Sequence, residues 1–338
     1  MDLFSTNTLT AVVDSLIRPP SFFLDRYFPT IETSETEEIH FDVTDAEERL
    51  APFVSPLVEG KIVESQGFNT KTFKPAYIKD KVVFDPFSPL KRRAGEAIGG
   101  SARPMDRTAA NLADALAKQS VRLTRRLEVM AAEALRAGQV TVAGDGYPTV
   151  VVDYGRNAGH TVTLGAGSKW GDAGIKPLDD LEDWATTVLD DSGSTITDVV
   201  MSPDAWRKFR EDADVKAILD NRRGGDGSNL SLVRRLGHAT FQGNIGDFDI
   251  WVYGGKYKDS AGVRQSILPA GTVMLLSSDV DGRRHFGAIR DEEAGFQARE
   301  MFPKSWIKKD PSVRYLLMQS APLTVPYRPD ATFTATVL

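Results

Sequence analysis

Four short segments near the carboxyl end decide the fold of this chain: Phe302-Pro303-Lys304-Ser305-Trp306, Asp310-Pro311, Met318-Gln319-Ser320-Ala321-Pro322-Leu323 and Phe333-Thr334-Ala335-Thr336-Val337-Leu338. In the last segment apolar residues alternate with threonine, a pattern typical of a strand. We therefore expect strands in this region, the last of them over residues 333–338.

Two further groups of segments lie in the same order along the chain. Near the amino end, Val54-Ser55-Pro56-Leu57-Val58-Glu59-Gly60 is followed by Phe73-Lys74-Pro75-Ala76-Tyr77-Ile78-Lys79. In the middle, Leu219-Asp220-Asn221-Arg222-Arg223-Gly224 precedes Gly243-Asn244-Ile245-Gly246-Asp247, then Val252-Tyr253-Gly254-Gly255-Lys256-Tyr257 and Leu268-Pro269. None of these strings is specific alone. In order and spacing they resemble, over nearly the whole chain, the lambda-like bacteriophage major capsid proteins, the phage capsid protein E family.

The resemblance implies an α+β protein with the Hong Kong 97-type phage capsid fold. It implies an N-terminal arm over 1–50 and an extended loop, a β-hairpin, over 51–100. A peripheral domain over 101–195 would contain a long spine helix at 106–137, and an axial domain would occupy 196–290. Residues 291–338 would return to the peripheral domain as C-terminal strands.

The resemblance also implies a function in assembly. Copies of the chain would form pentamers and hexamers of an icosahedral head shell that encloses double-stranded DNA without sequence-specific binding, as part of a virion assembled in the host cytoplasm. No long charged helical extension precedes the arm, so a separate scaffolding protein is expected as a partner. Portal and head-completion proteins are expected too, and a decoration protein at the three-fold positions is a further candidate. The alternative is an encapsulin-like nanocompartment shell around an enzyme cargo.

Composition narrows the classes of function. The 338 residues predict two or three domains, and the absence of cysteine excludes disulfides and thiolate metal sites. Neither a membrane span of ~18 apolar residues nor an export signal is visible. The net charge of −6 argues against a general nucleic-acid binder, although it suits a container whose inner wall holds phosphate weakly.

The first 50 residues are expected to form an arm, because Pro19-Pro20 and Pro29 interrupt them and their apolar groups are too few for a core. The arm's aromatic residues must dock on the rest of their own chain or on neighbouring subunits. The resemblance favours neighbours, and removal of residues 1–50 is then expected to leave a folded subunit that forms no regular shells.

Charge is segregated just after the arm. Eight acids and no base lie between Glu32 and Glu48, whereas eight bases and three acids lie between Lys61 and Arg93. Exposed ion pairs contribute only ~0–1 kcal/mol each, so such blocks suit the registering of subunits better than the stabilising of one fold. Two solvated faces of one sheet are the alternative. The candidate inter-subunit contacts are Phe22, Phe23, Tyr27, Phe28, Lys71, Lys74, Lys79, Lys81, Arg92 and Arg93.

Local patterns predict several elements directly. Leucines and Met130 at three-, four- and seven-residue steps predict a helix over 106–137, with Asp106 as its cap and Gly138 at its end. A helix is expected near 179–189, and another begins at Ser202-Pro203. The hairpin of the loop would pair 61–63 with 81–84. Strands are expected near Ala239, Ile250, Val273 and Phe286.

No arrangement of catalytic residues is apparent. Gly165-Ala166-Gly167-Ser168-Lys169 has the wrong spacing for a phosphate-binding loop, and the four histidines lack ligand spacing. Asp279-Val280-Asp281-Gly282 is better explained as a tight turn than as a calcium loop, and Asp291-Glu292-Glu293 as a solvated loop. We therefore predict no enzyme activity, metal or cofactor, and a hydrolase or nucleotide-binding enzyme is the weakest alternative.

Overall fold

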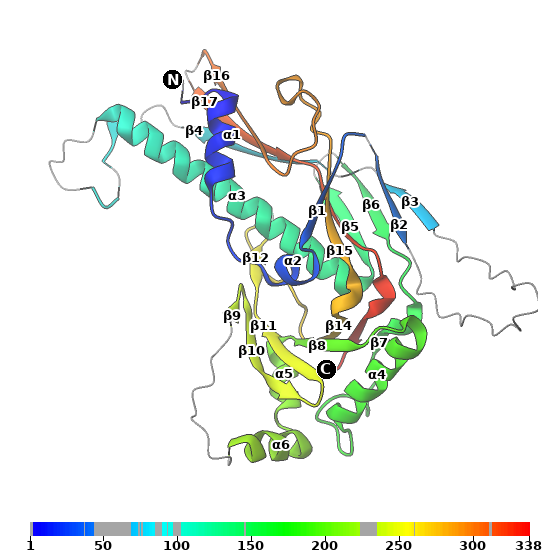
Figure 1. Cartoon of the computed structure of the whole chain (residues 1–338). Coiled ribbons are helices and arrows are strands. Elements are labelled where there is room, and N and C mark those ends of the chain that lie inside the picture. The colour runs from blue at the N-terminus through cyan, green and yellow to red at the C-terminus, as the bar shows by residue number, and fades with distance from the viewer. Residues whose placement is uncertain are drawn as a thin grey trace, which may run out of the picture.

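The long helix α3 (Pro104–Ala137) crosses the molecule and contacts both of its main sheets (Figure 1). A three-stranded sheet lies beside its first half, and a seven-stranded sheet lies toward its end. The computed structural model describes residues 3–36, 38–43, 69–73, 75, 77–84, 90–92, 94–96, 103–144, 147–223, 235–259, 261–310 and 313–338.

Helix α3 confirms the long helix predicted over 106–137. Its buried stripe includes Leu112, Leu116, Leu123 and Leu127. The cap differs from the prediction, since the helix begins after Arg103 with proline in its first turn. Proline suits that position because its missing N–H would have no partner there, so Asp106 falls within the first turn instead of at the cap.

Gly138 ends α3 in the left-handed conformation, with φ +64°. A side chain here would also meet Arg156, whose Cβ lies 2.7 Å from the position of an added Cβ. Both the backbone conformation and the close approach explain the predicted glycine.

The three-stranded sheet has the order β16 (Phe302–Lys308), β17 (Val313–Ser320), β4 (Ile78–Phe84), all antiparallel. One face packs on α3 and on α1 (Thr6–Ser15), where Phe84, Leu316 and Met318 are buried. The predicted strand at 81–84 is therefore present and pairs with β17. Its expected partner, 61–63, lies outside the described residues.

The seven-stranded sheet is built from distant parts of the chain. Its order is β7 (Thr161–Thr163), β19 (Thr332–Thr336), β14 (Thr272–Ser277), β8 (Ile196–Met201), β11 (Phe248–Tyr253), β10 (Ala239–Ile245), β9 (Arg235–Leu236). One face packs on α4 (Pro177–Ser192), α5 (Pro203–Phe209) and α6 (Ala213–Arg223). As predicted, Ser202 caps α5: its hydroxyl accepts a hydrogen bond from the Ala205 N–H.

The remaining described strands form a second three-stranded sheet and three separate pairs. This sheet has the order β1 (Thr30–Ser34), β15 (Gly282–Gly287), β18 (Pro322–Pro326). Three strand pairs are β2 (Ile39–Val43) with β3 (Asn69–Phe73), β5 (Gln139–Gly144) with β6 (Tyr147–Asp153), and β12 (Lys256–Lys258) with β13 (Arg264–Ser266). Short 3₁₀ turns occur at Ala158–His160, Ser278–Val280, Glu292–Ala294 and Pro329–Ala331.

Several contacts cross the boundaries that the sequence suggested. Helix α4 and strand β19 share one core with β8 and β14, although the expected boundaries at 195/196 and 290/291 separate them. The β2–β3 pair likewise joins residues on both sides of the boundary at 50/51. The reason is that sheet neighbours are set by non-local pairing, which local patterns do not contain.

Candidate assembly surfaces

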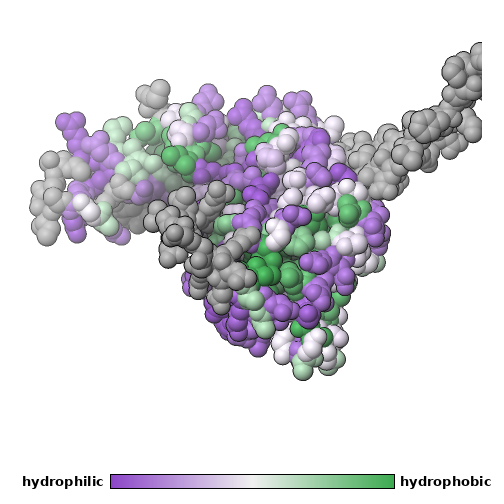
Figure 2. Space-filling view, turned by 60° about the horizontal axis from the view of Figure 1, so that its bottom comes forward, coloured by the Kyte–Doolittle hydropathy of each residue, from purple (hydrophilic) through white to green (hydrophobic). Residues whose placement is uncertain are grey.

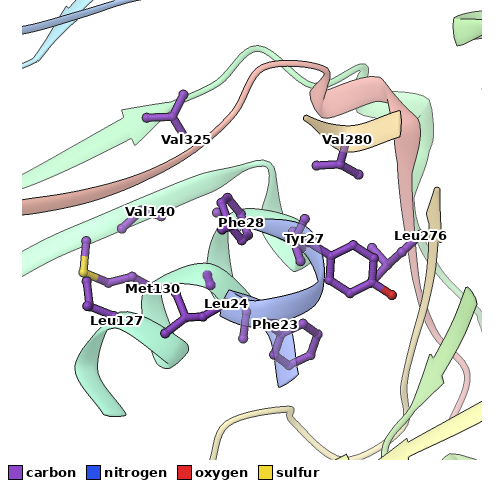
Figure 3. Close-up of a cluster of buried hydrophobic side chains, with 14 of the residues drawn as sticks. Phe23, Leu24, Tyr27, Phe28, Leu127, Met130, Val140, Leu276, Val280 and Val325 are labelled. Atoms are coloured by element: carbon purple, nitrogen blue, oxygen red, sulfur yellow. The ribbon is translucent and has the colours of Figure 1, made fainter. Parts of the chain in front are cut away.

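The aromatic residues of the arm lie inside the subunit. Helix α2 (Phe22–Tyr27) and the next residue place Phe22, Phe23 and Phe28 in a fully buried position, with Tyr27 nearly so. Figure 3 shows Phe23, Tyr27 and Phe28 within one cluster with side chains of α3 and of the neighbouring strands. This placement matches the alternative in which the arm docks on its own chain. A contact of these four side chains with a neighbouring subunit would require α2 to leave the core.

A buried carboxylate on α3 holds the first turn of α2. Glu128 accepts hydrogen bonds from the backbone N–H groups of Phe22 (3.0 Å), Phe23 (3.1 Å) and Leu24 (3.1 Å), and from the Tyr253 hydroxyl (3.1 Å). Burial raises the pKa of Glu128, and these four hydrogen bonds oppose the shift. The N–H groups at a helix start otherwise lack partners, so this carboxylate fixes α2 on α3.

A second buried carboxylate, Asp198 on β8, holds the other end of α2. It accepts two hydrogen bonds from the Arg26 guanidinium (2.7 and 2.8 Å), one from the Tyr27 hydroxyl (2.8 Å) and one from the Trp251 indole (3.1 Å). Burial and the nearby charge of Asp198 raise the pKa of Tyr27. Helix α2 is thus bonded to α3 and to the seven-stranded sheet at once, and it joins the two.

Only part of the predicted basic set can be placed. Lys79 and Lys81 are exposed on β4. Arg92 is also exposed, and its guanidinium donates to the backbone carbonyl of Glu96. Lys71 belongs to β3, but its side chain is not described, and Lys74 and Arg93 lie outside the described residues. Among the described residues, the structure therefore brings only Lys79 and Lys81 of this set onto one strand.

One face of the sheet β16-β17-β4 is only partly covered by the described residues. Opposite the face that packs on α1 and α3, the Lys81 ammonium lies 4.0 Å from the centre of the Tyr315 ring and 5.2 Å from that of Trp306. Such cation–aromatic contacts are favourable by ~0.5–1 kcal/mol at exposed sites. Val83, on the same face, is 60% exposed. We name as the lysine–aromatic face Lys79, Lys81, Val83, Trp306, Tyr315 and Leu317.

Four members of this face were not predicted as contact residues, namely Val83, Trp306, Tyr315 and Leu317. Trp306 and Tyr315 pair across β16 and β17, with ring centroids 5.5 Å apart, and both are half-buried. The signal available in the sequence was Trp306, an aromatic residue that alternates with Lys304 and Lys308 on β16. Strand β17 gave no such signal, because Tyr315 alternates with the apolar Val313 and Leu317. Lys81, the partner of both rings, comes from a strand more than 200 positions earlier, so the sequence alone did not join them.

The acidic segment at 291–293 agrees only in part with the predicted solvated loop, since Glu292 and Glu293 are exposed whereas Asp291 is not. Asp291 is largely buried and accepts hydrogen bonds from the Lys304 ammonium and the Gln319 amide, both at 2.9 Å. Although burial acts in the opposite direction, these hydrogen bonds lower the pKa of Asp291. The segment is an anchor on β16 and β17, because residues from two strands reach the same carboxylate.

The other candidate chemical motifs serve structural roles. Asp281 lies in the left-handed region at φ +43°, which confirms a tight turn. Gly165–Ser168 forms a turn that no helix follows directly. His160 is buried between the Thr332 carbonyl and Asp191. Across the described part of the chain no group of three or more metal-ligating side chains occurs, and no described helix is long and apolar enough to cross a membrane.

A long helix between two sheets, an arm held on its own core and a partly exposed sheet face define the class of this protein: it is a shell subunit with the Hong Kong 97-type fold. The structure resembles the solved structure of a prophage capsid protein from Escherichia coli CFT073, with a TM-score of 0.77 and 26% identity over 100% of both chains. The family model described as phage major capsid protein E matches residues 5–337, so the chain belongs to that family.

Relatives of known function agree with this assignment. The chain is 30% identical to the major capsid protein of Escherichia phage lambda over 335 residues, which are 98% of each chain. The same identity and coverage hold for the major capsid protein of Escherichia phage N15. The predicted family, fold class and function are thereby confirmed: this is a major capsid protein of the lambda-like type, a virion component and a structural protein instead of an enzyme. The nanocompartment alternative is not favoured.

Proposed function

We propose that copies of this chain form pentamers and hexamers that close an icosahedral head shell around the double-stranded DNA of a tailed phage. The family assignment supports self-assembly into a shell. The observation that carries the proposal in this chain is the partly exposed lysine–aromatic face, because an exposed patch of valine and aromatic residues rimmed by charge is typical of a protein interface. A closed symmetric shell repeats each such contact many times, so small contacts add up.

We further propose that the lysine–aromatic face receives acidic residues of a neighbouring subunit. The stretch from Glu32 to Glu48 holds eight acids and no base. Glu32 pairs with Arg283 of its own chain, which leaves seven acids as candidates. Lys79 and Lys81 would meet them, and Lys71, Lys74, Arg92 and Arg93 would extend the contact. We expect these charges to steer neighbouring subunits together and to set their register, since each exposed ion pair adds little affinity.

The domain roles remain part of the proposal. Residues 1–50 act as the arm, 51–100 as the extended loop, 101–195 as the peripheral domain with α3 as its spine, 196–290 as the axial domain, and 291–338 as the returning strands. Assembly takes place in the host cytoplasm. Its further partners are a separate scaffolding protein, portal and head-completion proteins, and a decoration protein at the three-fold positions.

Negative-stain electron microscopy of the purified chain at high concentration tests this function, with and without a candidate scaffolding protein. Closed uniform shells or hexamer sheets are expected, with the scaffolding protein narrowing the size distribution. Featureless monomers under every condition would contradict the proposal.

A further inference from the structure

A helix on the seven-stranded sheet and a hairpin at its edge carry opposite charge. Helix α4, which packs across β19, β14 and β8, presents the exposed acids Asp179, Glu182, Asp183, Asp190 and Asp191 and has no base within its bounds. Lys176, which precedes α4, is paired with Asp214. At the β9 end, the exposed bases Arg235, Lys256, Lys258 and Arg264 accompany one acid, Asp259, among the described residues.

The basic residues belong mostly to the hairpin β12–β13. This hairpin leaves the sheet at the β9 end, because the Gly254 N–H, just before β12, donates to the His238 carbonyl (3.1 Å). Asp259 is occupied within the hairpin, where its carboxylate accepts from the Val263 N–H and the Gln265 amide. The turn also exposes an apolar side chain, Val263, which is 54% exposed. The hairpin thus presents a valine between the cationic side chains of Lys258 and Arg264, for which the described residues supply no ion pair.

Helix α4 borders an apolar groove at the opposite end of β11 from the hairpin. A groove of about 500 Å³ lies between α4, α6 and the turn that joins β10 to β11. Its apolar lining includes Leu178, Leu189, Ile218 and Phe248, and Leu189 is 47% exposed. Two acids, Glu182 and Asp247, stand among the lining residues. Figure 2, in which the bottom of Figure 1 comes forward, shows hydrophobic residues gathered in the middle of this face with hydrophilic residues around them.

We propose that the β12–β13 hairpin of one copy docks in the α4 groove of the next copy. Val263 enters the apolar groove, and Lys258 and Arg264 face Glu182 and Asp247. In Figure 1 β12 and α4 lie apart, with β12 near the middle and α4 at the lower right. The two surfaces are different parts of the chain, so the contact between copies is head-to-tail. A head-to-tail contact generates a ring when its rotation closes. The inference rests on the proposed function, since it names the surfaces by which subunits join within a pentamer or hexamer.

The absence of cysteine makes a direct test available, because any disulfide must involve an introduced pair. The full-length double variant Val263→Cys with Leu189→Cys is oxidised under assembly conditions and resolved on a denaturing gel. A disulfide needs Cα atoms within ~4.4–6.8 Å, so it reports close contact only. We expect a ladder of covalent multimers that ends at the ring size, whereas each single variant gives at most dimers. The matched control pairs Val263→Cys with Val151→Cys, an equally exposed valine on β6.

The outcomes separate this inference from the proposed function. Shells by microscopy with no ladder above the control would overturn the hairpin contact and leave assembly standing. A ladder without shells would support the contact and count against shell assembly. The absence of both the ladder and the shells would count against the contact and against shell assembly. In a second arm, Glu182→Lys and Arg264→Glu should each reduce ring formation at least several-fold, and the double variant should restore it. Failure of that restoration would contradict the pairing.

Discussion

The arm helix α2 and the lysine–aromatic face both combine aromatic side chains with charged groups, yet they end in opposite states. In α2 the aromatic rings are buried and Glu128 and Asp198 meet the polar donors around them. On the lysine–aromatic face Lys81 and Val83 remain exposed beside half-buried aromatic rings. The difference shows that the arm does not serve assembly alone and that the body does not serve folding alone. The arm completes the subunit core, whereas a face of the body is left for a neighbour.

Removal of the arm should cause the largest loss of stability. Deleting residues 1–28 takes Phe22, Phe23, Leu24 and Phe28 out of the core, and each such side chain contributes about 1.5–3 kcal/mol by burial. The sum is comparable with the whole stability of a typical domain, about 5–15 kcal/mol. We expect loss of cooperative unfolding in urea, which corrects the expectation from the sequence that the body would fold without its arm.

The matched deletion of residues 1–16 removes α1 and keeps α2. It should lower the unfolding midpoint and retain a cooperative transition. A deletion of residues 1–28 that unfolded at the wild-type midpoint would show that α2 is not part of the core.

Loss of the Glu128 carboxylate, which holds the first turn of α2, should cause the next largest loss of stability. Glu128→Gln keeps the shape but turns an amide NH₂ group toward backbone donors, so the free energy of unfolding should fall by about 3 kcal/mol. Urea titration followed by tryptophan fluorescence measures it. The control is Glu133→Gln on the same helix, whose carboxylate accepts one backbone hydrogen bond and is partly exposed, with an expected loss under about 1 kcal/mol. Equal losses in the two variants would contradict the claim that the Glu128 carboxylate fixes α2 on α3.

Much of the structure could be predicted because its signals are local. The leucine spacing of α3, the cap at Ser202 and the glycine at 138 are all written in adjacent residues, and each is present. The docking of α2 could not be predicted, since Glu128 and Asp198 lie more than 100 positions from their partners. The same holds for the lysine–aromatic face, which forms only when β4 pairs with β17.

A smaller loss of folding stability is expected at low pH, because of His285 at the edge of the core. Burial lowers the pKa of His285, with Glu32 opposing and Arg283 assisting, and its ring bonds to the Tyr327 hydroxyl. Below pH ~6.5 the unfolded chain takes up a proton that the folded chain does not. Stability should therefore be complete above that pH and fall as the pH drops toward the lowered value, by at most ~1.4 kcal/mol per pH unit.

His285→Gln should remove this part of the pH dependence, measured by urea unfolding at several pH values. The matched control is the same substitution at an exposed histidine, His238→Gln. An unaltered profile in the His285 variant would refute this origin of the acid sensitivity.

The lysine–aromatic face should give the smallest effect on folding and a large one on assembly. Lys79→Glu with Lys81→Glu should lower the free energy of unfolding by only about 1 kcal/mol, because both side chains are exposed and the main loss is the contact of Lys81 with the Tyr315 and Trp306 rings. Shells should fail to form at ordinary salt, and the addition of Lys71→Glu and Lys74→Glu should deepen the defect. Electron microscopy compares these variants with the control pair Lys118→Glu and Lys309→Glu, which lie off the face and should assemble. Normal shells from the first pair would remove the role of this face.

The most direct test of the central claim is lysine labelling of the free subunit and of the assembled shell, read by mass spectrometry. The account predicts that Lys79 and Lys81 react readily in the subunit and are protected several-fold in the shell, while Lys118 reacts alike in both. Equal reactivity of Lys79 and Lys81 in the two states would contradict the claim that this face is completed by a neighbouring subunit.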